Sequence, residues 1–146
     1  MKILVVDDEP NLGRLCREEL EEDGYEVSII ATGAGAMESF RRESPDLVVL
    51  DIKLPDIDGL ELLALMKEIR GDVPVIMHTA FDYMYDLACD TSDAYVVKSG
   101  DFRELRATVR RIINERREKE EHGGPEGTRT KGGFVTLRSF YLVLIK

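Results

Sequence analysis

The sequence of 146 residues is poor in the side chains that build structural zinc sites and disulfide frameworks. It contains two histidines, no tryptophan and only two cysteines, Cys16 and Cys89, which lie far apart along the chain. Zinc sites need Cys and His at short spacings, and small disulfide-bonded domains need several cysteines. Neither class is indicated, so we expect both cysteines to serve as small core hydrophobes in a reducing compartment.

Long apolar runs and an excess of positive charge are missing as well. No segment reaches the roughly 18 apolar residues of a membrane-spanning helix, and no signal-peptide-like stretch follows Met1. The chain has 29 acidic and 20 basic residues, a formal net charge of -9, whereas nucleic acid binding needs a basic face. We therefore predict a cytoplasmic protein with no membrane association and no direct binding to nucleic acid.

What the sequence does contain is a repeated alternation of strand-like and helix-like segments. Five short and mostly uninterrupted apolar runs, typical of strands covered on both faces, occupy residues 3–6, 27–30, 47–50, 75–77 and 95–97. Parallel strands need crossover connections, and these are right-handed. The alternation predicts an α/β fold, a three-layer, doubly wound, five-stranded parallel sheet in the flavodoxin-like order 2-1-3-4-5.

The segments between the apolar runs have helical periodicity. Apolar stripes that we expect to face the core are Leu12, Leu15, Cys16 and Leu20 in the first helix, and Leu62, Leu65, Met66 and Ile69 in the third. Gly24 is a helix stop, and Ser44-Pro45 closes the second helix. We expect Asp101, with Glu104 three places on, to open the last helix in the manner of a capping box.

The pattern changes after about residue 114. A charged helix end leads into a Gly- and Pro-rich stretch that is typical of a linker. We predict one domain over residues 1–120, a flexible linker over 121–133 and an apolar tail over 134–146. The tail is too short to fold alone, and three interpretations stay open: a stub of a truncated output domain, an accessory or partner-binding strand, or a non-native end.

Polar side chains stand at the carboxyl ends of the predicted strands. Asp7 and Asp8 follow the first strand, Asp51 ends the third, Thr79 follows the fourth and Lys98 ends the fifth. Open parallel sheets bind ligands at this edge, so the joint placement of five such residues predicts a functional cluster. Each has a simpler interpretation alone: Asp8 as a helix cap, Thr79 as an ordinary loop hydroxyl, and Lys98 as a surface lysine.

Three converging carboxylates need a compensating charge. Two like charges about 4 Å apart repel by roughly 4 kcal/mol at an effective dielectric constant of about 20, so a cation or a proton is required. Oxygen ligands without His or Cys select Mg²⁺ or Mn²⁺ over zinc, and Mg²⁺ accepts phosphate oxygens as further ligands. A carboxylate nucleophile, a metal, a lysine and a hydroxyl together suit phosphoryl transfer.

The ordered set of polar residues resembles the receiver domains of bacterial response regulators in two-component systems. The resemblance covers roughly residues 1–120 and rests on Asp7-Asp8, Asp51, Thr79-Ala80, Lys98 and the loop Leu54-Pro55-Asp56-Ile57-Asp58-Gly59. It implies that Asp51 accepts a phosphoryl group from the phosphohistidine of a sensor histidine kinase or phosphotransfer protein. It also implies a conformational switch with slow autodephosphorylation rather than an enzyme.

The same resemblance assigns further roles. Asp8, Asp51 and the backbone carbonyl of Lys53 would coordinate Mg²⁺, for which Mn²⁺ can substitute, and Asp7 would help directly or through water. Lys98 and Thr79 would contact phosphoryl oxygens. Thr79 would act together with Tyr95 as the switch, whose aromatic ring moves inward. The face formed by helix four, strand five and helix five would serve output and homodimerisation.

Two features depart from the family pattern. Ser99 stands where a proline is usual, so the loop after Lys98 would be trans or more mobile, and Lys98 held less firmly. The stretch from Thr79 to Lys98 is short, which predicts a short or irregular fourth helix. Lys53 and Phe81 stand at positions that tune the access of water to the phosphoryl group. We assign His78 a structural role rather than a catalytic one.

The sequence disfavours three rival functions. A phosphatase of the haloacid-dehalogenase kind needs a second aspartate two residues after the nucleophile, where this chain has Lys53. A flavin-binding protein needs small polar groups after the first strand, where Asp7, Asp8 and Glu9 would repel phosphate. A degenerate receiver that only docks partners is disfavoured by the intact acids, threonine and lysine.

Overall fold

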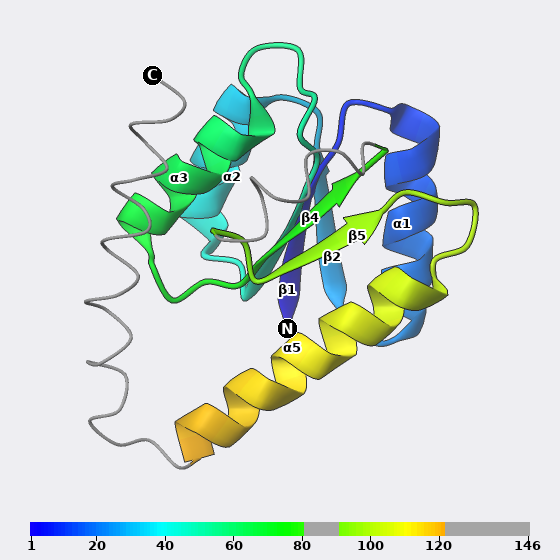
Figure 1. The fold of residues 1–146 in the computed structure, drawn as a ribbon, viewed down its shortest axis with the longest axis vertical. Coiled ribbons are helices and arrows are strands. Elements are labelled where there is room, and N and C mark those ends of the chain that lie inside the picture. The colour runs from blue at the N-terminus through cyan, green and yellow to red at the C-terminus, as the bar shows by residue number, and fades with distance from the viewer. Residues whose placement is uncertain (81–90, 122–146) are drawn as a thin grey trace.

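The computed structural model describes residues 1–80 and 91–121. Its centre is a parallel sheet of five strands in the order β2-β1-β3-β4-β5 (Figure 1). The strands are β1 Lys2–Val6, β2 Glu26–Ile30, β3 Leu47–Leu50, β4 Val75–Thr79 and β5 Ala94–Val97. The sequence prediction of an α/β fold with this strand order is confirmed.

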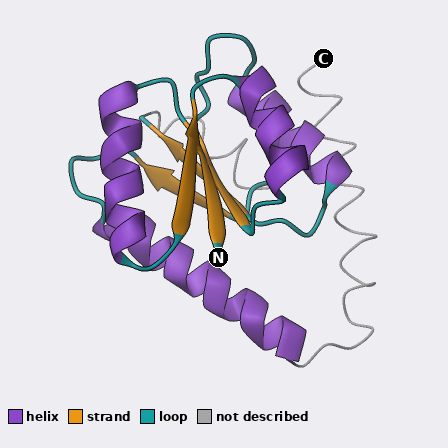
Figure 2. Ribbon diagram, turned by 180° about the vertical axis from the view of Figure 1, so that it is seen from behind, coloured by secondary structure: helices purple, strands orange, loops and turns teal. Residues whose placement is uncertain are grey.

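Helices cover both faces of the sheet (Figure 2). They are α1 Pro10–Glu22, α2 Gly33–Glu43, α3 Gly59–Ile69 and α5 Arg103–Glu121. Helices α2 and α3 share one buried apolar cluster with the sheet, around Phe40 and Met66. Helices α1 and α5 share the other, around Leu20 and Val109. The uninterrupted apolar strands, such as the wholly buried β3, therefore have apolar partners on both sides.

The strand register brings the carboxyl ends of neighbouring strands level. Val6, the last residue of β1, pairs with Leu50, the last residue of β3. On the other side, Thr79 of β4 pairs with Val97 of β5. Because polar residues follow these positions directly, the register alone sets them side by side along one edge of the sheet.

Helix ends mostly follow the local sequence signals. Gly24, with φ 91°, lies just beyond α1, and Ser44, with φ 48°, ends α2 in the left-handed region. Helix α5 begins at Arg103, whose backbone N–H donates to the Asp101 carboxylate at 2.9 Å. The Asp101 side chain therefore caps the backbone N–H of Arg103 and not that of Glu104. Phe102 lies directly before the helix, and its carbonyl accepts the hydrogen bond from the backbone N–H of Arg106.

The predicted apolar stripes are only partly right. Leu15, Leu65 and Ile69 are 44%, 36% and 43% exposed. Helix α1 packs through Gly13, where an added Cβ would lie 3.2 Å from Cγ2 of Ile29. Leu15 comes two residues later, roughly 200° around the helix axis from Gly13, and therefore faces solvent.

Helix α3 buries a lysine where the stripe predicted only apolar side chains. Lys67 is 3% exposed, and its ammonium donates to the carbonyl of Val73 and, at 2.9 Å, to the carboxylate of Asp93. Asp93 also accepts from the backbone N–H of Val75 at 2.7 Å. Lys67 therefore ties α3 to the start of β4 and to the residue before β5.

Several sequence predictions lie outside the described residues. These are the short fourth helix, the roles of Phe81 and Cys89, and the linker and tail beyond Glu121. Cys16 is buried as expected, and burial raises the pKa of its thiol to about 12. Within residues 1–80 and 91–121, no helix is both long and apolar enough to cross a membrane.

Candidate functional site

Three aspartates meet at the carboxyl end of the sheet. Asp7 directly follows β1, Asp8 comes next, and Asp51 directly follows β3. One carboxylate oxygen from each lies within 4.8 Å of the others. Asp7 and Asp51 are each 5% exposed, whereas Asp8 is exposed to solvent. The edge of the sheet thus presents a compact set of oxygen atoms with one open side.

Lys98 closes the cluster from the far strand. It directly follows β5, and its backbone N–H donates to the carbonyl of Thr79 at 2.7 Å. Its ammonium lies 2.8 Å from Oδ2 of Asp7, 2.8 Å from Oδ2 of Asp51 and 3.4 Å from Oε1 of Glu9. The side chain is 8% exposed, so these contacts form away from bulk water, where a charge pair is stronger.

Burial and charge act in opposite directions on the two central groups. Burial raises the pKa of Asp51, the Lys98 ammonium lowers it, and the neighbouring Asp7 raises it again, with a net upward shift. Burial works against the charge of Lys98, but the hydrogen bonds to Asp51 and Asp7 outweigh it, so the pKa of Lys98 is raised. Lys98 therefore stays cationic, while the Asp51 carboxylate binds a proton more readily than an ordinary aspartate does.

The donor set fits a hard divalent cation. The cluster offers carboxylate oxygens and neither sulfur nor imidazole nitrogen, which favours Mg²⁺ over zinc. Asp8 does not cap α1: the capping residue is Glu9, whose side chain makes no capping hydrogen bond. Asp7 is oriented by the backbone N–H of Glu9, which donates to its Oδ1 at 2.9 Å.

The loop after Asp51 folds back against that residue. Lys53 pairs with Asp58 as an isolated antiparallel bridge, and the backbone of Lys53 hydrogen bonds to the Asp51 carboxylate. The backbone N–H of Gly59 donates to the carbonyl of Ile52 at 2.6 Å. A Cβ at Gly59 would lie 2.0 Å from the carbonyl oxygen of Asp51, so only glycine permits this close approach.

Thr79 and Tyr95 lie on one face of the sheet. Thr79 is fully buried, and its hydroxyl oxygen has no hydrogen-bond partner among residues 1–80 and 91–121. Met77, two residues before it, belongs to the cluster against which Tyr95 packs, and Met77 pairs with Tyr95 in the register. Strand alternation therefore sets the Thr79 side chain on the same side as the Tyr95 ring.

His78 is built into the core on the opposite face from Thr79. It is 4% exposed, and its ring centroid lies 6.4 Å from that of Phe102 with an interplanar angle of 54°. Burial lowers the pKa of His78 to about 4, and the nearby Lys98 ammonium adds to this effect. The imidazole is therefore neutral at pH 7, in keeping with the structural role expected from the sequence.

The loop after Lys98 is held by its own hydrogen bonds. No peptide bond is cis within the described parts of the chain, so the Lys98-Ser99 bond is trans. The Ser99 hydroxyl donates to the carbonyl of Asp101 at 2.9 Å and accepts from its backbone N–H at 3.3 Å. Lys98 keeps its two short contacts with Asp7 and Asp51 although the usual proline is missing.

Two contributors to the site were missed by sequence reasoning. Glu9 approaches Lys98, and its only signal is the third acid in the run Asp7-Asp8-Glu9. Asp56 supported the family resemblance only as part of its loop, but its carboxylate accepts from the backbone N–H groups of Gly33 and Ala34 in α2. Residues 33 and 56 are 23 apart, so no local pattern predicts the contact.

Known proteins match this arrangement. A family model described as the response regulator receiver domain matches residues 3–110. The chain belongs to the response regulator receiver family. It is a receiver domain of the kind found in two-component signalling, and its family and fold predictions are confirmed.

Curated relatives include regulators from several organisms. The alkaline phosphatase synthesis transcriptional regulatory protein PhoP of Bacillus subtilis is 36% identical over 115 residues, which are 77% of this chain and 48% of that protein. The probable transcriptional regulator ycf27 of Porphyra purpurea is 39% identical over 77% of this chain and 47% of its own length. The receiver chain spans about half the length of the curated relatives it matches.

Solved structures are similar in the same region. The response regulator TrrA of Thermotoga maritima, in complex with Mg²⁺ and BeF, is 42% identical with a TM-score of 0.73 over 76% of this chain and 97% of that one. A complex of histidine kinase ThkA with TrrA matches with 41% identity and a TM-score of 0.72, over 77% of this chain and 97% of that one. The Asp7, Asp8 and Asp51 cluster fits Mg²⁺ binding of this kind.

Proposed function

We propose that this receiver is a phosphorylation-driven switch in which Asp51 accepts a phosphoryl group from a sensor histidine kinase or phosphotransfer protein. The observation that carries the proposal is the place of Asp51 between a cation and two acids. Its carboxylate lies 2.8 Å from the Lys98 ammonium and within 4.8 Å of the carboxylates of Asp7 and Asp8. A nucleophilic oxygen, a fixed cation and a metal-binding edge are the requirements of phosphoryl transfer.

The transfer forms one bond and breaks one. A carboxylate oxygen of Asp51 bonds to phosphorus while the bond from phosphorus to the donor's imidazole nitrogen breaks, and its electron pair leaves with the imidazole. Lys98 compensates charge on a phosphoryl oxygen without moving far, because its ammonium already lies beside Asp51. The raised pKa of Lys98 keeps it charged throughout.

Mg²⁺ would be held by Asp8, Asp51 and the backbone carbonyl of Lys53, with Asp7 assisting directly or through water. The metal supplies positive charge that offsets the three carboxylates and the phosphoryl oxygens. The proposed Lys53 ligand is supported by the hydrogen bond between its backbone and Asp51. Mn²⁺ can take the place of Mg²⁺ because it prefers the same oxygen ligands.

Thr79 and Tyr95 would convert phosphorylation into a change of shape. The buried Thr79 hydroxyl lacks a partner among the described residues, and a phosphoryl oxygen on Asp51 would give it an acceptor. A shift of Thr79 changes the packing beside Tyr95 on the same face of the sheet. Output, and homodimerisation through the surface formed by helix four, β5 and α5, would follow from this shift, and slow autodephosphorylation would reset it.

Labelling by a small phosphodonor tests the proposal. With acetyl phosphate and Mg²⁺, we expect intact-mass spectrometry to show one added phosphoryl group on the wild type and none on Asp51→Asn or after chelation of the metal. The matched control is Asp46→Asn, an aspartate just before β3 at the opposite end of the strand, which should label as the wild type. Equal labelling of Asp51→Asn refutes the acceptor, and an unlabelled wild type favours a docking module.

A further inference from the structure

We propose that Asp56 is a positioning residue of the metal site, because it fastens the tip of the phosphoacceptor loop to the first turn of α2. The phosphoacceptor loop is the segment 51–58 between β3 and α3. The Asp56 clamp denotes the Asp56 carboxylate with the backbone N–H groups of Gly33 and Ala34. This inference rests on the proposed function, since it concerns the loop that supplies the Lys53 carbonyl.

The clamp is a two-point contact with charge assistance. Oδ1 of Asp56 accepts from the N–H of Gly33 at 2.8 Å, and Oδ2 accepts from the N–H of Ala34 at 2.9 Å. These two hydrogen bonds lower the pKa of Asp56, so the carboxylate is ionised at neutral pH. A negative group is favoured there because the first N–H groups of a helix point outward unpaired and carry partial positive charge.

Shape complementarity fixes the loop in the same place. A Cβ at Gly33 would lie 2.1 Å from Cγ2 of Ile57, so α2 and the loop approach as closely as a glycine allows. Ile57 also packs against the buried cluster between α2, α3 and the sheet. The clamp and the Ile57 contact together leave the loop tip little freedom to shift along α2.

The base of the loop is fastened independently. Asp58 caps α3 by accepting from the N–H of Leu60 at 2.8 Å, and it pairs with Lys53 in the isolated bridge. The backbone of Lys53 in turn bonds to the Asp51 carboxylate. The loop therefore has one attachment at α3 and one at α2, with Lys53 between Asp51 and the clamped tip. Release of the tip removes the attachment to α2, and the Lys53 carbonyl is then held only by the bridge to Asp58 and the hydrogen bond to Asp51.

A coupling of this kind is reciprocal. If the clamp favours the loop position that binds Mg²⁺, then Mg²⁺ must favour the clamp by the same factor. Bound metal should therefore slow amide hydrogen exchange at Gly33 and Ala34, although neither residue is a proposed metal ligand. A carboxylate that merely caps α2 would leave exchange there insensitive to the metal.

Metal affinity is the first test. We expect Asp56→Ala to weaken Mg²⁺ binding, measured by isothermal titration calorimetry on the full chain, by about threefold to tenfold. That is at or below the lower end for groups that hold a metal ligand in place. Asp56→Asn, which keeps one acceptor oxygen, should fall between Asp56→Ala and the wild type.

Thr32→Ala is the matched control. The Thr32 hydroxyl caps the same helix by accepting from the N–H of Gly35 at 3.1 Å, but it makes no hydrogen bond to the loop. We expect Thr32→Ala to lower thermal stability about as much as Asp56→Ala while leaving Mg²⁺ affinity within about twofold of the wild type, as for a lost cap alone. Equal weakening by both variants overturns the inference.

Hydrogen exchange supplies the second readout. We expect Mg²⁺ to slow exchange at Gly33 and Ala34 in the wild type, and to have no such effect in Asp56→Ala. Metal-independent exchange in the wild type overturns the inference. Asp8→Asn distinguishes failure of the proposed metal site from failure of the clamp. If Asp8→Asn binds Mg²⁺ as the wild type does, the proposed metal site is wrong. If Asp8→Asn loses binding while Asp56→Ala keeps it, only the clamp fails.

Discussion

At the scale of single residues, Asp8 differs from the two aspartates beside it. Asp7 and Asp51 are buried and share the ammonium of Lys98, whereas Asp8 is exposed and lies outside the ion pairs that Lys98 forms. Its charge therefore faces two like charges within 4.8 Å, and no cation among residues 1–80 and 91–121 forms an ion pair with it. Such an arrangement favours metal binding at the expense of stability in the absence of metal.

We therefore predict that Asp8→Asn stabilises the metal-free protein. Removing one of three neighbouring like charges should raise the free energy of unfolding by about 1 kcal/mol, a fraction of the roughly 4 kcal/mol repulsion of one pair at 4 Å. Added Mg²⁺ should stabilise the wild type but not the variant, because ligands that bind the folded state shift the equilibrium towards it. Urea unfolding with and without Mg²⁺ checks both parts, and a less stable metal-free variant contradicts the account.

His78 carries a second prediction at this scale. Its folded pKa of about 4 lies below the value of about 6.5 for an unfolded chain, so the unfolded state binds a proton first as the pH falls. The contribution of a neutral His78 to stability should be complete above pH 6.5 and decline towards pH 4. An NMR titration of the imidazole in His122→Gln, which leaves a single histidine, should find no titration near pH 6.5. A midpoint there would show that the ring is solvated.

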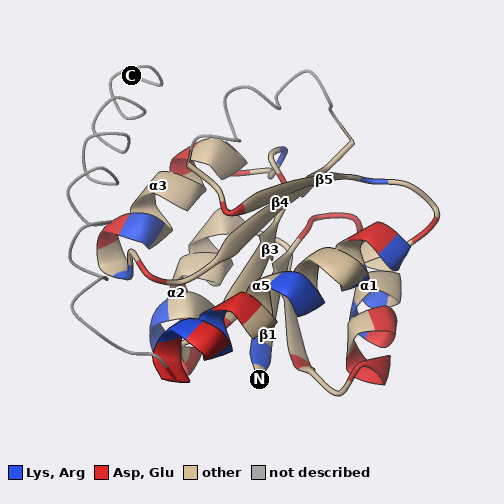
Figure 3. Cartoon of the chain, turned by 60° about the horizontal axis from the view of Figure 1, so that its bottom comes forward, with Lys and Arg blue, Asp and Glu red and all other residues tan. Residues whose placement is uncertain are grey.

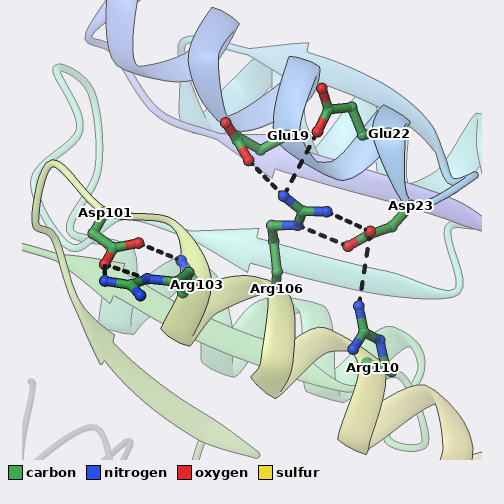
Figure 4. A network of polar contacts seen from close by, with 7 residues as sticks. All are labelled: Glu19, Glu22, Asp23, Asp101, Arg103, Arg106 and Arg110. Atoms are coloured by element: carbon green, nitrogen blue, oxygen red, sulfur yellow. Dashed lines mark hydrogen bonds and ion pairs between the residues drawn. The ribbon is translucent and has the colours of Figure 1, made fainter.

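At the scale of helices, an ion-pair network joins α1 to α5 (Figure 4). Arg106 donates from Nε to Oδ2 of Asp23 at 3.0 Å, from Nη2 to Oδ1 of Asp23 at 2.6 Å and from Nη1 to Glu19 at 2.8 Å. Arg110 lies 3.8 Å from the same Asp23 carboxylate. Figure 3 shows acidic and basic residues interleaved along α5. The two-point contact fixes how α5 sits against the end of α1.

We predict that Arg106→Lys lowers the free energy of unfolding at pH 7 by about 1 kcal/mol, because lysine cannot form the two parallel hydrogen bonds and the site is partly exposed. The hydrogen bond from Arg106 lowers the pKa of Asp23, so the contribution is complete above the unfolded value of about 3.9. It should be lost as the pH falls through the lower folded value.

Arg103→Lys is the control for that measurement. Arg103, the first residue of α5, pairs with Asp101 just before that helix, but its side chain is 89% exposed (Figure 4). We expect no measurable change in denaturant unfolding, as for most exposed ion pairs. Equal losses for both variants, or a loss for Arg106→Lys that persists at pH 2, would show that packing rather than charge is responsible.

Elements differ in how far the sequence predicted them. The strands could be predicted because uninterrupted apolar runs such as residues 47–50 require cover on both faces, and their order then sets Asp51 beside Asp7. The rotation of α1 that exposes Leu15 could not, because it depends on the contact between Gly13 and Ile29. Buried Lys67 could not either, since its partners come from distant loops.

At the scale of the whole molecule, the site is assembled from segments that the fold alone brings together. The acids and the lysine come from the ends of β1, β3 and β5, and the loop that follows β3 leans on α2. All of these lie within residues 3–110, the region that matches the receiver family. The proposed domain over residues 1–120 therefore contains everything the proposed chemistry requires.

The location of the site within residues 3–110 predicts the behaviour of a shortened chain. A protein ending at Glu121 should keep the melting temperature of the full chain to within about 4 °C, which corresponds to less than 1 kcal/mol for a domain of this size. It should also label with acetyl phosphate to the same extent. Calorimetry and mass spectrometry check the two parts, and loss of either would show that residues beyond Glu121 belong to the folded unit.

The central claim is that three aspartates, Lys98 and Thr79 surround a single phosphoryl position on Asp51. A crystal structure of the chain with Mg²⁺ and beryllofluoride, an analogue of the phosphoryl group, tests it most directly. We expect beryllofluoride on Asp51, contacts to it from Lys98 and the Thr79 hydroxyl, and Mg²⁺ bound by Asp8, Asp51 and the Lys53 carbonyl. Beryllofluoride on another carboxylate, or Mg²⁺ bound away from Asp51, would contradict the account.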